Sequence, residues 1–221
     1  MTPVVVLVTD PRYALEHTAR VIRSAAAALG TGRLLVQLRD KESRESDLAL
    51  AARTLRDVTR EARAVFVVNG PAALARSVGA DGVHLPGSTE ATLASRVAAA
   101  RALLGESAVI TAAAHDDDEL RAADLAGATA ALVSPIFATP GKGPARGVAA
   151  IAAARAIVDA SRRSPALLVY ALGGVMPENA VECGLAGADG VAVIRALYDV
   201  AGESGVHDAV LALARAVSQR P

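Results

Sequence analysis

Short, nearly continuous apolar runs alternate along this chain with longer stretches whose apolar positions recur with a helical period. Continuous runs are typical of strands in a parallel sheet covered on both faces, because both sides of each strand are then buried. This pattern predicts eight strands: Val4–Val8, Leu34–Leu38, Val65–Val68, Gly82–Leu85, Ala108–Ala112, Ala130–Val133, Leu167–Leu172 and Gly190–Ile194.

Helical patterns fill the segments between the strands. Thr89 and the run Asp116–Asp118 have side-chain oxygens that suit helix N-caps, and Pro177 suits a first helical turn. The predicted helices are Ala14–Leu29, Ser46–Glu61, Ala72–Val78, Thr89–Leu103, Asp116–Leu125, Val148–Ala160, Pro177–Cys183 and a last helix from Val206 to Ser218.

One short sequence recurs along the chain. GADGVHL at 79–85 returns as GADGVAV at 187–193 and, more loosely, as GATAALV at 127–133. Each copy follows an alanine-rich helical stretch, with a glycine where the helix should end and an apolar run after it. The alternatives are chance similarity between helix ends and an open doubly wound sheet, which needs fewer strands. A repeated helix–glycine–strand unit favours a parallel barrel, so residues 1–221 are predicted to form one (βα)8 TIM barrel.

Composition narrows the class of protein. Twenty-three basic residues balance 23 acidic ones and aromatic residues make up 2% of the chain, so a nucleic-acid partner is not expected. The single cysteine, Cys183, excludes an intramolecular disulfide and a cysteine-rich zinc site. No secretion signal and no apolar run long enough for a membrane span are found, so a cytoplasmic protein is expected. The apolar helix faces permit a homodimer.

In such barrels the chemistry lies just beyond the carboxyl ends of the strands. After the second strand, alternation sends Gln37, Arg39 and Lys41 to one side, where two cations and an amide suit a phosphate or pyrophosphate. The alternative is an ordinary solvated strand end. His84 and His115 follow two adjacent strands and are candidates for moving protons near pH 7, or else satisfied polar groups.

Two further segments favour an anionic ligand. The long irregular segment 134–147 is either a flexible loop or a lid, whose Lys142 and Arg146 close over an anion. After the seventh strand, Gly173 and Gly174 let backbone N–H groups approach a phosphate, and Arg195 after the eighth strand adds a charge. The change Gly174→Val is expected to weaken phosphate-ester binding without unfolding the barrel.

Taken in order, these segments resemble the thiamin phosphate synthase/TenI family. The matching elements are Val8-Thr9-Asp10, Gln37-Leu38-Arg39-Asp40-Lys41, Val68-Asn69, Gly79–Leu85, Ala114-His115, Pro135–Thr139 with Lys142, Gly173-Gly174-Val175 and Gly187–Val191. The resemblance implies a (βα)8 barrel with one of two activities. The synthase joins a pyrimidine pyrophosphate to a thiazole phosphate and releases pyrophosphate with Mg²⁺, whereas the TenI-type tautomerase isomerises a thiazole carboxylate phosphate.

The resemblance also implies roles for the candidate residues. Gln37, Arg39 and Lys41 meet the pyrimidine and its pyrophosphate, with Asn69 beside them. Thr139 and Lys142 come from the loop after the sixth strand, and Lys142 is counted with His84 and His115 as catalytic. The remaining residues hold the thiazole phosphate: Gly173, Gly174 and Arg195.

The departures from the family decide between the branches. Gly70 and Thr89, with Glu90 next to it, stand where the synthase carries its two magnesium aspartates. Magnesium requires carboxylate oxygens, so no metal ligand is predicted, and Mg²⁺ is expected only if the chain is a synthase. The TenI-like branch is therefore the main hypothesis. An active synthase is the alternative, with Glu90 or a substrate phosphate compensating at the metal, and an inert phosphate-binding regulator is a further alternative.

The match to the TenI branch is incomplete as well. Pro135 stands where that branch has its catalytic histidine, and Ala113 stands where the family usually has a serine. If the chain is a tautomerase, His84 or His115 must replace the missing proton carrier.

Overall fold

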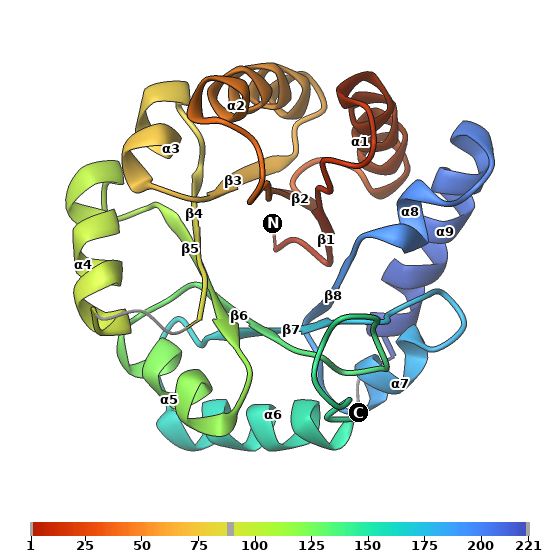
Figure 1. Cartoon of the computed structure of the whole chain (residues 1–221). Coiled ribbons are helices and arrows are strands. Elements are labelled where there is room, and N and C mark those ends of the chain that lie inside the picture. The colour runs from red at the N-terminus through yellow and green to blue at the C-terminus, as the bar shows by residue number, and fades with distance from the viewer. Residues whose placement is uncertain (1, 88–90, 220–221) are drawn as a thin grey trace.

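The structure is a computed structural model that describes residues 2–87 and 91–219, and in it eight parallel strands close into a barrel (Figure 1). Each strand pairs with its neighbours in sequence, and β1 pairs with β8 through Val5 and Val191. The strands are β1 Val5–Val8, β2 Leu34–Leu38, β3 Val65–Asn69, β4 Gly82–Leu85, β5 Val109–Ala114, β6 Ala130–Val133, β7 Leu168–Leu172 and β8 Gly190–Val193. The predicted (βα)8 TIM barrel is confirmed.

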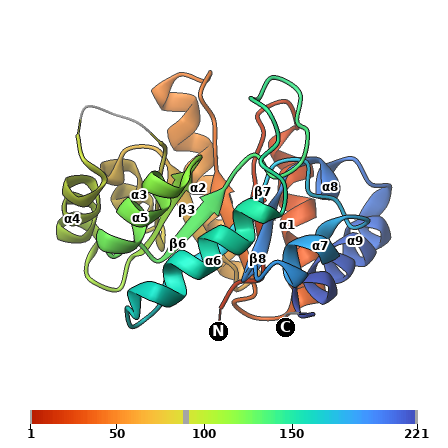
Figure 2. The same ribbon diagram turned by 90° about the horizontal axis from the view of Figure 1, so that it is seen from below.

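Helices surround the barrel and cover its outer face (Figures 1 and 2). They are α1 Leu15–Leu29, α2 Glu45–Glu61, α3 Ala72–Val78, α4 Leu93–Leu104, α5 Asp117–Leu125, α6 Ala149–Ser161, α7 Ala180–Leu185, α8 Arg195–Tyr198 and α9 Gly202–Val217. In the part of the chain that the structure describes, none of these helices has the length and apolar character needed to cross a bilayer.

The near-continuous apolar runs are explained by burial on both faces of each strand. All four residues of β1 are buried, with Val5 and Leu7 packed in the layer between strands and helices. Val6 and Val8 belong instead to a smaller cluster inside the barrel. That interior cluster comprises Val6, Val8, Leu35, Val67, Ala130, Leu132, Tyr170 and Ala192.

The aspartate of each GADG copy ties a strand to its neighbour at the amino-terminal end of the barrel. The Asp81 carboxylate accepts the backbone N–H of Phe66 on β3 at 2.8 Å and pairs with Arg56 of α2 at 2.9 Å. Asp189 does the same one repeat later, since it accepts the N–H of Val169 at 2.7 Å and pairs with Arg155 at 3.2 Å.

The looser third copy keeps half of this arrangement. The Thr129 hydroxyl stands where the aspartate would be and accepts the backbone N–H of Ile110 on β5 at 3.0 Å. The nearby ion pair comes from a different position, because Arg163 pairs with the buried Asp124 at 2.9 Å. The repeat therefore records a recurring strand-to-strand contact at this end of the barrel.

Helix boundaries differ from the predictions at α4, α7 and α9, and α9 begins at Gly202 rather than at Val206. Thr89 lies outside the described residues, and the cap of α4 is Thr92, whose hydroxyl accepts the N–H of Ser95 at 3.3 Å. Asp116 caps α5 as predicted. The placement of Pro177 in a first helical turn is wrong, because α7 begins at Ala180. The short helix α8 carries too few residues to show a periodic pattern, and it was not predicted.

Two tyrosines join the first and last units of the barrel. The rings of Tyr13 and Tyr198 stack with centroids 4.2 Å apart and planes 8° apart. The Tyr13 hydroxyl donates to Asp199, and the Tyr198 hydroxyl donates to Thr18 at 3.2 Å. The loop between β1 and α1, the short helix α8 and helix α1 are thus connected where β1 pairs with β8 and closes the barrel.

Candidate functional site

A cavity of about 690 Å³ lies at the carboxyl ends of the strands and takes residues from all eight strand ends. The structure brings eleven of the residues singled out in the sequence to the wall of this cavity, while their roles in binding and catalysis stay predictions. These residues are Gln37, Arg39, Lys41, Asn69, His84, His115, Thr139, Lys142, Gly173, Gly174 and Arg195.

The β2 side of the cavity is held in place by β1. The backbone N–H of Thr9 donates to the carbonyl of Gln37 at 2.9 Å, and the Thr9 hydroxyl accepts the N–H of Arg39 at 2.9 Å. These bonds fix the register of the strand end, so alternation brings Gln37, Arg39 and Lys41 to the same cavity.

Gln37 carries an acceptor without a partner. Its side chain is buried in the barrel, and among the described residues no group donates to its Oε1. An unpaired buried acceptor costs about 1–3 kcal/mol, so such groups usually meet a ligand or water in the functional state. The Oε1 atom is therefore available to accept a hydrogen bond from an N–H or O–H group of a ligand in the cavity.

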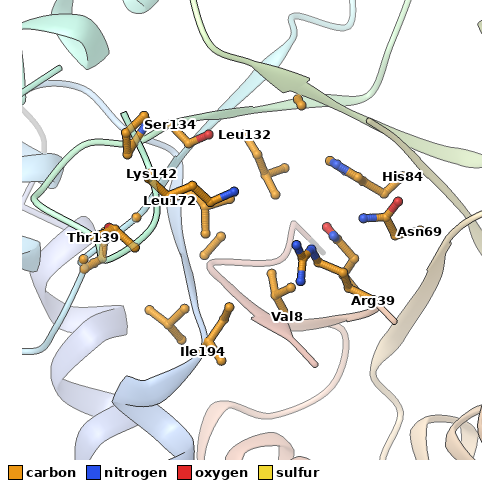
Figure 3. A pocket seen from close by; sticks show the side chains of 18 of the residues that line it. Val8, Arg39, Asn69, His84, Leu132, Ser134, Thr139, Lys142, Leu172 and Ile194 are labelled. Atoms are coloured by element: carbon orange, nitrogen blue, oxygen red, sulfur yellow. The ribbon is translucent and has the colours of Figure 1, made fainter. Parts of the chain in front are cut away.

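His84 is a neutral histidine directed into the cavity (Figure 3). Its Nδ1 lies 2.9 Å from the hydroxyl of Thr111 on β5. Burial, reinforced by the positive charges of Arg96 and Arg39, lowers the pKa of His84 to about 3. The ring is therefore uncharged at neutral pH and suits hydrogen bonding rather than attraction of an anion.

His115 occupies the rim rather than the depth of the cavity. Its side chain is about half exposed, and its Nδ1 lies 2.9 Å from Glu119 on the first turn of α5. The same carboxylate oxygen accepts the backbone N–H of His115 at 2.7 Å. Gly87 lies against the ring, since a β-carbon there would be 2.9 Å from it. The two histidines thus differ in depth, exposure and partner.

The loop 134–147 stands above the mouth of the barrel (Figure 2) and contributes a cation from the opposite wall. Lys142 points from this loop into the cavity (Figure 3). Arg146 does not, because its guanidinium pairs with Asp117 of α5 at 3.0 Å. The expectation that Arg146 closes over an anion is wrong, since its charge anchors the base of the loop.

Gly173 and Gly174 support this loop from below. The N–H of Phe137 donates to the carbonyl of Gly173 at 2.9 Å. Gly174 has a positive φ of +65°, and a β-carbon there would lie 2.8 Å from that of Phe137. The change Gly174→Val is therefore not the local test expected from the sequence, because it would also displace the loop.

Arg195 opens the short helix α8 beside this turn. Its side chain is exposed and lines the cavity, and it makes no ion pair with any residue in 2–87 or 91–219. The cavity therefore holds four cations without a carboxylate partner in the described chain: Arg39, Lys41, Lys142 and Arg195.

Sequence reasoning missed two charged residues of the wall. Arg12 follows β1, and its guanidinium binds Asp10 at 2.6 Å, which holds the pKa of that carboxyl below its usual range. Glu119 was also missed, although its spacing of four residues from His115 is a helix-face signal that marks such pairs.

The described residues do not fit a magnesium ion. Glu119 is the one carboxylate among the described residues that line the cavity, and it is already bound to His115. Gly70 follows Asn69, and no group of three metal-capable side chains occurs in the described part of the chain. Thr89 and Glu90 lie outside those residues. Magnesium binds through carboxylate oxygens in near-octahedral order, which this donor set does not provide.

Comparisons with known proteins agree with the fold. Residues 5–197 match the family model described as "Thiamine monophosphate synthase". The thiamine-phosphate synthase of Moorella thermoacetica is 36% identical over 89% of this chain and 88% of its own length. That of Methanoculleus marisnigri is 38% identical over 94% and 92%. A solved thiamine phosphate pyrophosphorylase from Pyrococcus furiosus is 26% identical, covers 97% of this chain and 95% of its own, and superposes with a TM-score of 0.74.

Proposed function

Because this chain belongs to the thiamine monophosphate synthase family, we propose that it is a transferase that joins a pyrimidine pyrophosphate to a thiazole phosphate and releases pyrophosphate. The observation that carries the proposal is the set of unpaired cations, which reach one cavity from opposite walls. Guanidinium and ammonium groups bind phosphates strongly, and two separated sets suit two phosphorylated substrates. The relatives are named thiamine-phosphate synthases. These names favour the transferase activity over the TenI-like isomerisation, which is the main hypothesis from the sequence.

The pyrimidine pyrophosphate belongs on the β2–β3 side. Arg39 and Lys41 attract its phosphates, and Asn69 lies on the neighbouring strand (Figure 3). The unpaired Oε1 of Gln37 accepts a hydrogen bond from the ring system, which removes the cost of its burial.

The thiazole phosphate belongs on the opposite side, beneath the loop 134–147. Lys142 and Arg195 supply charge there, and Thr139 lies on the same wall. The turn at Gly173 and Gly174 brings main chain close to the ligand, since neither residue carries a side chain.

The transfer step places demands that this cavity meets. The carbon–oxygen bond of the pyrimidine's methylene group breaks, and its electron pair leaves on pyrophosphate. The thiazole nitrogen supplies the electron pair of the new carbon–nitrogen bond. The methylene carbon becomes electron-poor during this exchange, so the neutral His84 suits the neighbourhood better than a charged imidazole would.

Tautomerisation of a thiazole carboxylate phosphate is the second candidate function. The observations that favour it are the misfit of the described wall to magnesium and the two histidines that line the cavity. A proton must then leave and return near the thiazole ring, and His84 and His115 are the candidate carriers.

Product analysis separates these functions. The purified protein is incubated with the pyrimidine pyrophosphate and thiazole phosphate, and separately with the thiazole carboxylate phosphate, and products are followed by mass spectrometry and NMR. We expect thiamine phosphate and pyrophosphate in equal amounts from the first mixture. Isomerisation alone would support the tautomerase, and binding without either product would support the inert regulator.

A further inference from the structure

The positive charges on the β2 side of the cavity make no ion pair in the described chain, although the charge of Arg39 helps to lower the pKa of the nearby Asp10 and Asp40. Asp40 lies between Arg39 and Lys41 in sequence, but its carboxylate accepts the backbone N–H groups of Glu42 and Ser43, each at 2.9 Å. Asp10 is bound to Arg12. The charges of Arg39 and Lys41 are therefore left for a ligand.

These same residues stand beside the position where a metal-binding carboxylate is missing. Asn69 pairs with the β4 residue His84 in the barrel, and Gly70 follows it directly. A magnesium ion between carboxylates and a pyrophosphate supplies positive charge to that anion. In this chain the one carboxylate of the described wall, Glu119, is bound to His115, and cationic side chains are present at the edge of that wall.

We propose that Arg39 and Lys41 themselves carry the charge compensation of pyrophosphate, so that this chain binds and releases pyrophosphate without a divalent cation. The inference rests on the proposed function. A guanidinium offers two parallel N–H donors to phosphate oxygens, and an ammonium adds a compact charge, so together they match an anion with several negative charges. When the carbon–oxygen bond breaks, the electron pair moves to a pyrophosphate oxygen held by these groups, and no proton, oxidant or metal-bound water is required.

The structure allows the missing carboxylate to be introduced. A β-carbon on Gly70 would meet only the Val68 side chain, at an ordinary contact distance of 3.5 Å, and Gly70 has no positive φ. The backbone therefore accepts the β-carbon of Gly70→Asp, and this change places a negative charge next to Asn69 in sequence. Gly70→Asn is the matched neutral control.

The test is calorimetric titration of inorganic pyrophosphate into the full chain, in EDTA and in Mg²⁺. We expect the wild-type Kd to differ by less than threefold between the two buffers. Arg39→Ala and Lys41→Ala are each expected to weaken binding in EDTA by more than tenfold. Arg44→Ala, whose exposed side chain pairs with Asp47 on the neighbouring helix, is the control and should leave the Kd unchanged. Gly70→Asp should weaken binding in EDTA and regain it in Mg²⁺, whereas Gly70→Asn should not.

Loss of wild-type binding in EDTA would overturn the inference, because pyrophosphate would then need a divalent cation. Turnover of the two substrates is measured in the same buffers. Tight pyrophosphate binding in EDTA with no thiamine phosphate formed would overturn the proposed function and leave the charge compensation in place. Turnover that requires Mg²⁺ would overturn the charge compensation and leave the proposed function in place.

Discussion

The two ends of this barrel use charged residues in opposite ways. At the amino-terminal end, arginines pair with buried or half-buried aspartates. Arg56 and Arg155 lie on helices and their partners precede β4 and β8, whereas Arg163 follows α6 and its partner lies in the last turn of α5. The pairs are Asp81–Arg56, Asp124–Arg163 and Asp189–Arg155, at 2.9, 2.9 and 3.2 Å. Asp81 and Asp189 also accept a backbone N–H from a neighbouring strand, so the pairing connects helix, strand and strand.

At the carboxyl end, four cations converge on a cavity and make no ion pair in the described chain, and Arg12, which is bound to Asp10, is the exception on this wall. The difference separates charges that are paired within the fold from charges that remain available to the proposed ligands. Unpaired like charges at one mouth repel one another and cost some stability, which is common at functional sites. Substitutions at the two ends should therefore have separable effects on stability and activity.

The largest effect is expected at the mouth. Replacing Lys142 with alanine removes a cation that points into the cavity, and we expect kcat/KM for the proposed transfer to fall by roughly 10²–10³-fold. Thermal melting should stay unchanged, because Lys142 is exposed and makes no ion pair in the described chain. A parallel loss of melting temperature would place Lys142 among the structural charges and break the comparison.

The second largest effect is expected at the amino-terminal end of the barrel. Asp189→Ala removes a buried carboxylate together with its bonds to Val169 and Arg155, and should lower the free energy of unfolding by about 3 kcal/mol. Asp159→Ala is the matched control, because Asp159 is an exposed partner of the same arginine and its loss should cost less than about 0.5 kcal/mol. Urea denaturation measures both. Equal costs would remove the distinction between the two partners.

A third prediction concerns pH. The folded pKa of His84 is about 3, well below the ordinary value of 6.5, so between these values the unfolded chain binds a proton that the folded chain does not. Stability should therefore fall as the pH falls below 6.5, by on the order of 2 kcal/mol between pH 6.5 and 5. His84→Gln should flatten this part of the curve. Parallel curves for the two proteins would assign the acid sensitivity to other groups.

The smallest effect sharpens the comparison. Arg195→Gln removes one of the unpaired charges of the mouth, and at low salt we expect the free energy of unfolding to stay level or rise by about 0.3 kcal/mol. The same variant should bind thiazole phosphate more weakly in calorimetry. A clear loss of stability would mean that Arg195 has a structural role.

Periodicity was sufficient to predict the barrel and the strand ends that form the cavity. The apolar runs record burial on both faces, and parallel strands place their carboxyl ends on one side. The pairing of charges was beyond such reasoning, because partners such as Asp189 and Arg155 lie far apart in sequence and meet only through packing. Arg146 was misplaced for the same reason, since its contact with Asp117 depends on how α5 lies beside the loop.

The stacked tyrosines at the closure of the barrel have an optical consequence. The chain contains no tryptophan and three tyrosines, and two of these, Tyr13 and Tyr198, form the stack. The third, Tyr170, lies inside the barrel with its hydroxyl on the carbonyl of Pro3. Ultraviolet absorbance and emission of the unlabelled protein therefore come mainly from the stacked tyrosine pair at the closure of the barrel and from the interior Tyr170. Separation of the first and last units would unstack the pair and alter the ultraviolet spectrum.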